Sequence, residues 1–306
     1  GVVFTLHHVR PEGEHVSGPN AHLSVTPEFL DEAIEAALEC GLTPAALEDL
    51  PARLADKADD RKFVAFTLDD GYRNNAEYAA PVFRRHAVPY TIFITEGFVE
   101  RTRSLWWETA ERLTRLDRPL AFHGEKLSLA SETERTAAFN RIAAFVQTED
   151  EDRAVDVLDE TARKHGIDPL AITAELTMDA DELRALAADP LAHFGAHTVT
   201  HVNLRRVDPT RLDAELRRSA DAVERYLGRR PCAFAYPYGF AAAVGEREFR
   251  AAAEAGLTVA VTTLPGVLSA RDAERPTALH RVSLNGRYQK RRYVKALISG
   301  LPFRLM

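Results

Sequence analysis

Two adjacent carboxylates, Asp69 and Asp70, follow an apolar run and precede Gly71. Two negative side chains at a buried strand end repel one another and are costly to desolvate unless a positive group lies between them. A metal ion would remove this cost, with one aspartate as a ligand and the other free to act as a base. Alternatively, the pair is a turn in which an aspartate caps a helix starting near Asn74 and Gly71 adopts positive φ.

A second group with suitable chemistry is the histidine pair His197 and His201, four residues apart. A helical turn after His197 would direct both imidazoles to one side, at a separation that suits one metal ion. Two histidines and a carboxylate form a usual catalytic zinc shell with one position left for water. Alone, a histidine pair at this spacing is more often structural. Together with the double aspartate it predicts a metal site.

Other apolar runs also end in polar or ionisable residues, namely His7-His8, Thr95-Glu96 and the segment 236–239 (YPYG). In parallel barrels the carboxyl ends of the strands carry the reacting groups, because the loops there converge on one mouth. The repetition of this pattern predicts an active site.

These groups must be positioned by alternating strands and helices. Seven apolar runs read as buried strands: Val2–Leu6, Phe63–Leu68, Tyr90–Thr95, Ala192–Ala196, Cys232–Tyr236, Leu257–Thr262 and Leu279–Leu284. Helices are expected between them, for example from Thr26-Pro27 to Cys40-Gly41, over Ala76–His86 and from Asp208-Pro209 to Leu227-Gly228. Continuously apolar strands that feed helices predict an α/β protein with a parallel barrel.

The third and fourth strands are separated by a long segment, and we expect a mostly helical insertion at about residues 100–176. It should contain a hairpin over residues 120–129 and then two helices, the first opened by a capping box at Ser131–Glu134. The segment is polar and short, so we expect it to have no large core of its own. Residues 1–306 are interpreted as one barrel domain that carries this insertion.

The composition limits the class of protein. The 306 residues have a net charge of −7, with 45% hydrophobic and 28% charged residues. This argues against nucleic acid as a partner, and the basic run Arg287–Lys295 is expected to be a solvated helix face. Cys40 and Cys232 provide neither a disulfide framework nor a thiolate metal site.

No apolar stretch reaches the roughly 20 residues that span a bilayer. We see no secretory signal, which slightly favours a cytoplasmic location, and the compartment stays open. The oligomeric state stays open.

Three segments resemble motifs of the polysaccharide deacetylase family. Residues 66–72 (FTLDDGY) are similar to the first motif, whose core is TFDDG, and residues 197–201 (HTVTH) match the second, His-Ser/Thr-x-x-His. Residues 234–239 (FAYPYG) resemble the third, which carries Pro-Tyr. The motifs appear in the expected order, and the resemblance covers nearly the whole chain except the insertion. It implies a distorted (β/α) barrel of seven strands.

The resemblance also implies roles for residues. Asp70, His197 and His201 would bind a divalent metal, usually zinc, although cobalt, nickel or manganese would suit the same ligands. Asp69 would be the base that takes a proton from the metal-bound water. The backbone N–H of Tyr238 would help to stabilise the oxyanion. Alternatively, the tyrosines at 236 and 238 only pack at the turn that Pro237 sets.

This chain departs from the family pattern at three places. The arginine that the third motif often carries is missing, and Arg281 is our candidate for the partner of Asp69. No tryptophan stands in the fourth motif; Trp106 and Trp107 of the insertion would either stack on a sugar or anchor the insertion to the barrel. The fifth motif ends in a histidine that acts as general acid, and His280 is our candidate for it.

Histidines at the first strand end, His8 and His7, are the alternatives for the acid, since an imidazole has a suitable pKa. His8 and Tyr236 are further candidates for substrate contacts, with the two tryptophans.

The leading hypothesis is a hydrolase that removes an N-acyl group, usually acetyl, from an amino sugar in an oligosaccharide, polysaccharide or glycolipid. One alternative is hydrolysis of a non-sugar amide or cyclic imide, as in allantoinase-like relatives, which tend to lose metal ligands. Another is a carbohydrate-binding protein without activity, in which Asp69 or a ligand should be lost. All of these residues are retained here.

Overall fold

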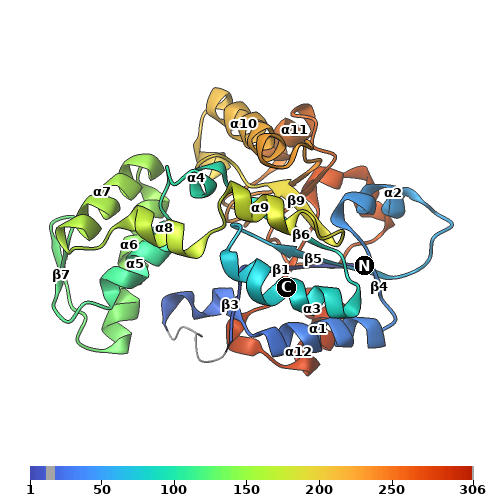
Figure 1. Ribbon diagram of the computed structural model, residues 1–306, viewed down its shortest axis with the longest axis horizontal. Helices are drawn as coiled ribbons and strands as arrows, with labels where there is room; N and C mark the ends of the chain where they lie inside the picture. The colour runs from blue at the N-terminus through green and yellow to red at the C-terminus, as the bar shows by residue number, and fades with distance from the viewer. Residues whose placement is uncertain (12–17, 305–306) are drawn as a thin grey trace.

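The computed structural model describes residues 1–11 and 18–304, and its main element is a curled parallel sheet (Figure 1). Seven strands follow one another across it in the order β11, β10, β9, β6, β5, β1 and β12, and a short β4 (Thr43–Pro44) also pairs with β5. Their bounds are β1 (Val2–Leu6), β5 (Phe63–Leu68), β6 (Tyr90–Ile94), β9 (Ala192–Ala196), β10 (Ala233–Ala235), β11 (Val259–Val261) and β12 (Val282–Ser283). All seven predicted strands are present, some of them shorter than expected.

The two edges of the sheet are brought together by the segment 279–283. Its first residue, Leu279, bridges to Val261 of β11, and its amide donates to the Ala260 carbonyl at 3.0 Å. Its last two residues form β12, which pairs with β1. The predicted distorted seven-stranded (β/α) barrel is thereby confirmed. A separate pair of short strands, β2 (His8–Val9) and β3 (Ser24–Val25), follows β1.

Helices cover the outside of the sheet, and the predicted helix starts are found. Helix α1 (Pro27–Glu39) begins at Thr26, whose hydroxyl accepts from the Phe29 amide, and α10 (Pro209–Leu227) ends at Gly228 with φ 72°. The helix expected over Ala76–His86 is a π-helical turn, η4 (Asn75–Ala79), followed by α3 (Ala80–His86). The others on the barrel are α2 (Leu50–Ala55), α11 (Glu246–Glu254) and α12 (Arg291–Ile298), with 3-10 turns η2 (Pro19–Leu23), η3 (Leu47–Asp49), η5 (Leu204–Arg206), η6 (Ala270–Glu274), η7 (Pro276–Ala278), η8 (Gly286–Tyr288) and η9 (Leu301–Arg304).

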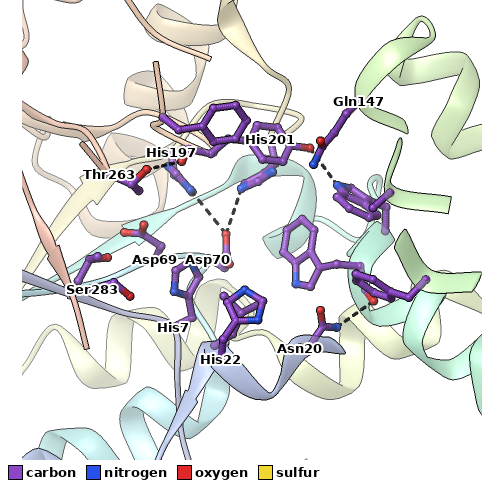
Figure 2. Close-up of a pocket in the computed structure, with 18 of the residues that line it drawn as sticks. His7, Asn20, His22, Asp69, Asp70, Gln147, His197, His201, Thr263 and Ser283 are labelled. Atoms are coloured by element: carbon purple, nitrogen blue, oxygen red, sulfur yellow. Dashed lines mark hydrogen bonds and ion pairs between the residues drawn. The ribbon is translucent and has the colours of Figure 1, made fainter. Parts of the chain in front are cut away.

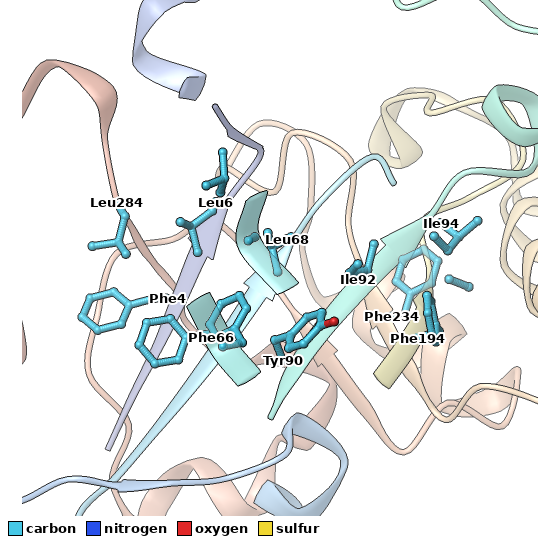
Figure 3. Packing of buried hydrophobic residues seen from close by; sticks show 14 of the residues in the cluster. Phe4, Leu6, Phe66, Leu68, Tyr90, Ile92, Ile94, Phe194, Phe234 and Leu284 are labelled. Carbon is cyan, nitrogen blue, oxygen red and sulfur yellow. The ribbon is translucent and has the colours of Figure 1, made fainter. Parts of the chain in front are cut away.

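The strands send alternate residues to two separate cores. Phe4, Phe66 and Tyr90 point outward and pack beneath the helices in one large cluster (Figure 3). Val3 and Ala65 belong to a second cluster inside the barrel. This alternation follows from the period of two in a β-strand, and it decides which residues at the strand ends can face the barrel mouth.

The segment between β6 and β9 forms the insertion, which lies to one side of the barrel in Figure 1. The hairpin of β7 (Leu120–Phe122) and β8 (Glu125–Leu127) and the two helices after it are present, and Ser131 caps the first. There are more helices than expected. The complete set is α4 (Glu96–Val99), α5 (Trp106–Thr114), α6 (Glu132–Thr148), α7 (Glu151–Lys164), α8 (Pro169–Leu176) and α9 (Ala180–Leu186).

The insertion has a hydrophobic cluster of its own, contrary to our expectation. Leu113, Ile142 and Leu158 are fully buried in it, Tyr72 of the barrel sequence also belongs to it, and Leu23 and Tyr238 pack against it. Short helices can build such a core because each contributes one apolar stripe to a shared centre. The division into one barrel domain with an insertion at about 100–176 stays a prediction.

Two further sequence expectations concern surfaces. Of the basic run Arg287–Lys295, Arg291 and Lys295 pair with Glu39 of α1, as on a solvated helix face. None of the helices in the described ranges combines the length and apolar character that a membrane span needs.

Candidate metal centre and active-site cavity

Asp70, His197 and His201 converge at the carboxyl ends of β5 and β9 (Figure 2). Nε2 of His197 lies 3.6 Å from Oδ1 of Asp70, and Nε2 of His201 lies 3.5 Å from the same oxygen. One ligand atom from each residue lies within 4.8 Å of the other two, and all three residues are buried. The structure thus brings together the three residues that the sequence motifs singled out as metal ligands.

The state of these groups fits a cation. Oδ1 of Asp70 is buried and has no hydrogen-bond partner among residues 1–11 and 18–304. Burial, followed by the charges of Asp69 and Glu108, raises the pKa of Asp70 well above its usual range. A buried acceptor without a donor is costly. A divalent ion at this point would offset that cost and stabilise the ionised carboxylate.

The two imidazoles are prepared as neutral ligands. Burial is the main cause that lowers the pKa of both His197 and His201, so neither carries a proton on both nitrogens at neutral pH. Nδ1 of His197 lies 2.6 Å from the Ala235 carbonyl, which fixes the tautomer and leaves Nε2 as the lone-pair donor. Two nitrogens and one oxygen match the donor set of catalytic zinc sites.

The chain between the histidines does not form the helical turn that we expected. Thr198 and His201 both adopt left-handed conformations, with φ 65° and 55°. A residue that sequence reasoning missed stabilises this loop: the carboxylate of Glu215 accepts from the amides of Val199 and Thr200 at 2.6 and 3.0 Å. Glu215 belongs to α10, and no spacing rule connects it with the histidines.

The second carboxylate, Asp69, forms a forked ion pair with Arg281. Nη1 and Nη2 of Arg281 each donate to one oxygen of Asp69 at 2.7 Å, and the guanidinium is fully buried. Burial of Asp69 would raise its pKa, but the charge and hydrogen bonds of Arg281 hold the pKa well below its usual range. The contact expected between these two residues is therefore present, and Asp69 is ionised beside Asp70.

Tyr238 lies at the turn after β10 and lines the same cavity. Its φ of 62° is in the left-handed region, so the turn must be held by other contacts. Its hydroxyl donates to Oε1 of Glu151 at 2.6 Å and accepts from Nε1 of Trp106 at 2.9 Å. The insertion therefore holds this tyrosine from two sides.

The two tryptophans of the insertion anchor it and line the cavity, whereas stacking on a sugar stays a prediction. Nε1 of Trp107 donates to the Tyr72 hydroxyl at 2.9 Å, which anchors α5 to the barrel. Trp106 and Trp107 also line the cavity. They anchor the insertion and offer aromatic surface to a ligand.

Three predicted site residues do not reach the cavity. His280 is not among the lining residues, and its ring lies against Gly266. His8 is fully buried, with Glu108 at 3.2 Å on one ring nitrogen and Asn74 at 2.7 Å on the other. The hydroxyl of fully buried Tyr236 donates to the Thr277 carbonyl.

Strand alternation is the physical reason for these corrections. Leu279, Arg281 and Ser283 face the inside of the barrel. His280 lies between Leu279 and Arg281 in the chain and therefore faces away. Tyr236 and His8 likewise point from the sheet toward the surrounding elements. A substrate contact of these three residues has no support in this geometry.

The histidine that does reach the cavity is His7, which we had predicted only as an alternative. Its ring lies next to Asp69 and Asp70 in Figure 2. Burial lowers its pKa to about 4, while the charge of Asp69 acts in the opposite direction. Alternation along β1 could have selected it, since Val3, Thr5 and His7 share one face.

The cavity has a volume of about 590 Å³, in the range of small-molecule sites. The three candidate metal ligands form one part of its wall, and the insertion forms another. Besides the residues already described, it is lined by Thr5, Asn20, His22, Leu23, Phe139, Asn140, Ala143, Ala144, Gln147, Phe240, Thr263 and Ser283.

Comparison with known families gives the class of this protein. Residues 56–260 match the sequence model of polysaccharide deacetylases. The chain belongs to the polysaccharide deacetylase family. A comparison with curated protein sequences finds no match.

Solved structures share the fold at low sequence identity. The deacetylase PplD of Streptococcus pyogenes, solved in complex with acetate, is 17% identical with a TM-score of 0.60, covering 93% of this chain and 92% of its own. The polysaccharide deacetylase BC0361 of Bacillus cereus is 16% identical with a TM-score of 0.59 over 97% of this chain and 68% of its own. IcaB of Ammonifex degensii is 16% identical with a TM-score of 0.55 over 97% and 96%. These similarities establish the fold.

Proposed function

We propose that this protein is a metal-dependent hydrolase that removes N-acetyl groups from an amino sugar in an oligosaccharide, polysaccharide or glycolipid. The observation that carries the proposal is the buried group Asp70, His197 and His201 beside a second, ionised aspartate in one cavity. Family membership supports the reaction class, and the structural relatives include a deacetylase in complex with acetate, the expected product.

Zinc is the metal that we propose, since two imidazoles and one carboxylate match its catalytic sites, although cobalt, nickel or manganese would fit the same donors. The bound cation would polarise the amide carbonyl and lower the pKa of a water molecule at the site. Asp70, His197 and His201 would hold it. The contact of His197 with the Ala235 carbonyl would keep that ring in the orientation that binding requires.

Asp69 is our candidate for the base that takes a proton from the attacking water. Arg281 keeps its carboxylate ionised and fixes both oxygens. A carboxylate that is bound this strongly by a guanidinium is a weak base. The attacking water must therefore be made more acidic, which the proposed metal ion would do. Arg281 acts through Asp69 and is a positioning residue.

We assign the remaining steps to Tyr238 and His7. The backbone N–H of Tyr238 would donate to the oxyanion of the tetrahedral intermediate. The leaving amine must gain a proton, and His7 is our candidate to carry it, in place of His280. His7 is neutral, so the proton that Asp69 takes from the attacking water would have to pass to His7 and from there to the leaving amine, which returns Asp69 to its carboxylate form.

Two measurements test this proposal. Metal analysis of the purified protein should give one divalent ion per chain, and Asp70→Ala protein should contain much less. Acetate release from N-acetylated chito-oligosaccharides should fall by at least about 10³-fold in Asp69→Asn protein, in the range of losses that follow removal of a catalytic group. Absence of any divalent ion, or full activity of the Asp69→Asn protein, would contradict the mechanism.

A further inference from the structure

Helix α6 of the insertion presents one of its faces to the active-site cavity. Five of its residues line the cavity: Phe139, Asn140, Ala143, Ala144 and Gln147. Counted from Phe139, the other four follow after one, four, five and eight residues, which places all five on one side of an α-helix. The adjacent side, with Ile142 and Val146, is buried in the core of the insertion. The helix is therefore fixed by the core of the insertion, to which Phe139 also belongs, while Asn140, Ala144 and Gln147 are exposed at the cavity.

The polar groups on this face are amides without partners. Within residues 1–11 and 18–304, the side chains of Asn140 and Gln147 form no hydrogen bond, and both are exposed. Figure 2 shows the amide of Gln147 directed toward the cavity. Asn20 on the opposite wall differs, since its amide donates to the Trp107 carbonyl. Asn140 and Gln147 can thus donate to a ligand and accept from it without breaking a contact of the protein.

Only small side chains stand between these two amides on the helix, and the rings of Trp106 and Phe139 lie next to this surface. Ala143 and Ala144 separate Asn140 from Gln147, so no long side chain fills the space between them. Trp106 stacks on Phe139 with 6.4 Å between ring centroids. Flat apolar surface bordered by amide groups suits a sugar ring, which has apolar faces and hydroxyl groups at its edge.

The charges of the cavity restrict the ligand further. Among its lining residues, in the part of the chain that the structure describes, there is no lysine or arginine. The guanidinium of Arg281, which lies next to the cavity, is buried and engaged by Asp69. Apart from the proposed metal ion, which the acetamido group would occupy, a chain that carries carboxylates or phosphates would lose water on entering and meet no lysine or arginine among the described lining residues.

We infer that α6 forms the subsite for the sugar unit next to the one that is deacetylated, and that the substrate is an uncharged chain of at least two units. Asn140 and Gln147 determine this preference through hydrogen bonds to the hydroxyl groups of the neighbouring unit. The inference rests on the proposed deacetylase function and adds to it a substrate class and a minimum length.

The test compares N-acetylglucosamine with its β-1,4-linked dimer and trimer. For the wild-type protein we expect kcat/KM to be at least about tenfold higher on the dimer than on the monomer. In the double variant Asn140→Ala, Gln147→Ala, the value on the dimer should fall about tenfold, as expected for two neutral hydrogen bonds, and the value on the monomer should change less than about twofold. Thr133→Ala is the control, since Thr133 is exposed on the same helix and does not line the cavity.

Other results would overturn the inference. Equal kcat/KM of the wild-type protein on monomer and dimer would exclude the subsite. An equal loss of kcat/KM on both sugars in the double variant would show that Asn140 and Gln147 act only through the fold. A trimer whose middle unit carries a carboxylate should react at least about tenfold more slowly than the neutral trimer, because its charge loses water without gaining a partner. Equal rates would contradict the restriction to uncharged chains.

Binding separates the failure of this inference from the failure of the proposed function. Calorimetric titration of Asp69→Asn protein with the monomer and the dimer repeats the comparison without turnover. A triple variant adds Asn140→Ala and Gln147→Ala to this protein. If wild-type protein with its metal releases no acetate but the Asp69→Asn protein binds the dimer tightly and the triple variant does not, the subsite stands and the reaction is another one. If neither sugar binds, the subsite is excluded.

Discussion

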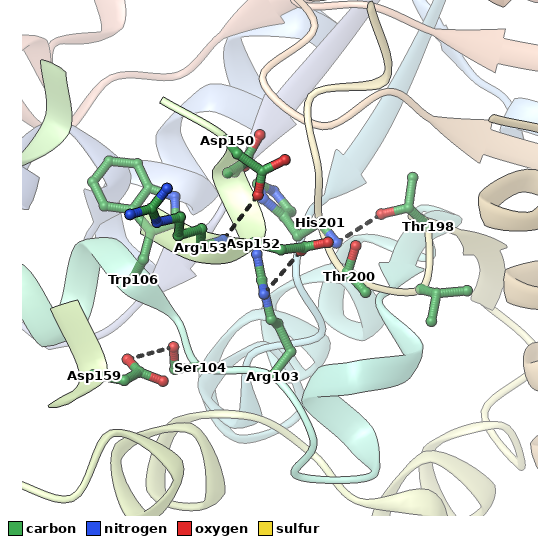
Figure 4. Close-up of polar contacts among 12 residues, drawn as sticks. Arg103, Ser104, Trp106, Asp150, Asp152, Arg153, Asp159, Thr198, Thr200 and His201 are labelled. Atoms are coloured by element: carbon green, nitrogen blue, oxygen red, sulfur yellow. Dashed lines mark hydrogen bonds and ion pairs between the residues drawn. The ribbon is translucent and has the colours of Figure 1, made fainter. Parts of the chain in front are cut away.

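Two buried carboxylates, Asp69 of the barrel and Asp159 of the insertion, have pKa values that are shifted in opposite directions. In the barrel, Asp69 receives both arms of a fully buried guanidinium, and its pKa is lowered. In the insertion, the buried Asp159 accepts one hydrogen bond from Ser104 at 2.9 Å (Figure 4), and burial raises its pKa to about 6. Arg163 approaches Asp159 at 3.9 Å, from a half-exposed position.

The proposed reaction requires Asp69 to be ionised, whereas the insertion does not require a charge on Asp159. Desolvation favours the neutral form of any buried acid, and a strong fixed cation is needed to reverse that preference. The barrel provides this cation at the residue that we assign to catalysis. At Asp159 the insertion provides the more distant and half-exposed Arg163 instead, which fits a structural support in which no ionised group is needed.

The largest effect is expected from Arg281→Met. The substitution leaves Asp69 buried without its partner, and we expect a loss of about 3–5 kcal/mol in the free energy of unfolding together with loss of acetate release. Urea denaturation at about pH 7.5 measures the first quantity. Arg163→Met in the insertion is the matched control and should cost less than about 1 kcal/mol, because that pair is largely exposed on the arginine side. Similar costs for the two variants would remove the contrast between the regions.

The next prediction concerns the pH dependence of the insertion. A carboxyl group with a pKa of about 6 in the folded chain and about 4 in the unfolded chain binds its proton more tightly when folded. Its contribution to stability is complete below about pH 4 and is lost as the pH rises through about 6. Asp159→Asn cannot ionise, and its amide oxygen can still accept from Ser104. The variant should match the wild type at about pH 4 and be more stable by about 2 kcal/mol at about pH 8.

Unfolding curves at both pH values check this prediction. Glu160→Gln, on the exposed side of the same helix, is the control and should change stability by less than about 0.5 kcal/mol at either pH. A variant that is destabilised at the higher pH would show that Asp159 is ionised and paired in the folded protein, as Asp69 is.

How far the sequence could predict this molecule depends on the range of the interactions. The strands, the ends of α1 and α10 and the meeting of Asp70 with the two histidines follow from local patterns and motifs, and the structure contains them. Strand alternation favours His7 over His280, whereas the order of the family motifs favours His280. Glu215 could not be predicted, because its link to residues 199 and 200 exists only after α10 packs on the loop. The core of the insertion was missed because each of its helices has only a short apolar stripe.

The third prediction compares a residue that binds the loop between the two histidines directly, Glu215, with one that contacts it through other residues, Asp152. Glu215→Ala removes the acceptor of the Val199 and Thr200 amides, and we expect zinc affinity to fall about 10–100-fold, as for other residues that orient ligands. Competition with a chromophoric chelator measures this affinity. Asp152 of the insertion reaches the loop only indirectly, since it lies 3.3 Å from Arg211, which in turn binds Glu215. Asp152→Ala should lower the affinity less than about threefold, because Asp152 is half-exposed and its pairs with Arg211 and Arg103 do not touch the proposed metal ligands. An equal loss would mean that the insertion controls the metal site.

The smallest effect is expected where the insertion contacts the turn after β10. Oε1 of Glu151 accepts from the Tyr238 hydroxyl, and Oε2 accepts from the Asn203 amide at 2.9 Å, so this side chain joins two loops of the barrel mouth. In Glu151→Gln one oxygen can still accept, but the NH₂ group can only donate. We expect kcat to fall about three- to tenfold with KM nearly unchanged, because the backbone N–H of Tyr238 acts only on the transition state.

A double-mutant cycle decides whether the effect of Glu151 passes through this turn. Tyr238→Phe removes the hydroxyl and retains the backbone N–H, and it should lower kcat by a similar factor. If Glu151 acts through the hydroxyl, the double variant should be no slower than the slower single variant, whereas independent roles would multiply the two losses. Ser104→Ala, a change at the Asp159 contact elsewhere in the insertion, should leave kcat unchanged. Independent losses would show that the insertion supports the barrel at Asn203 and that the tyrosine turn keeps its left-handed conformation without help from Glu151.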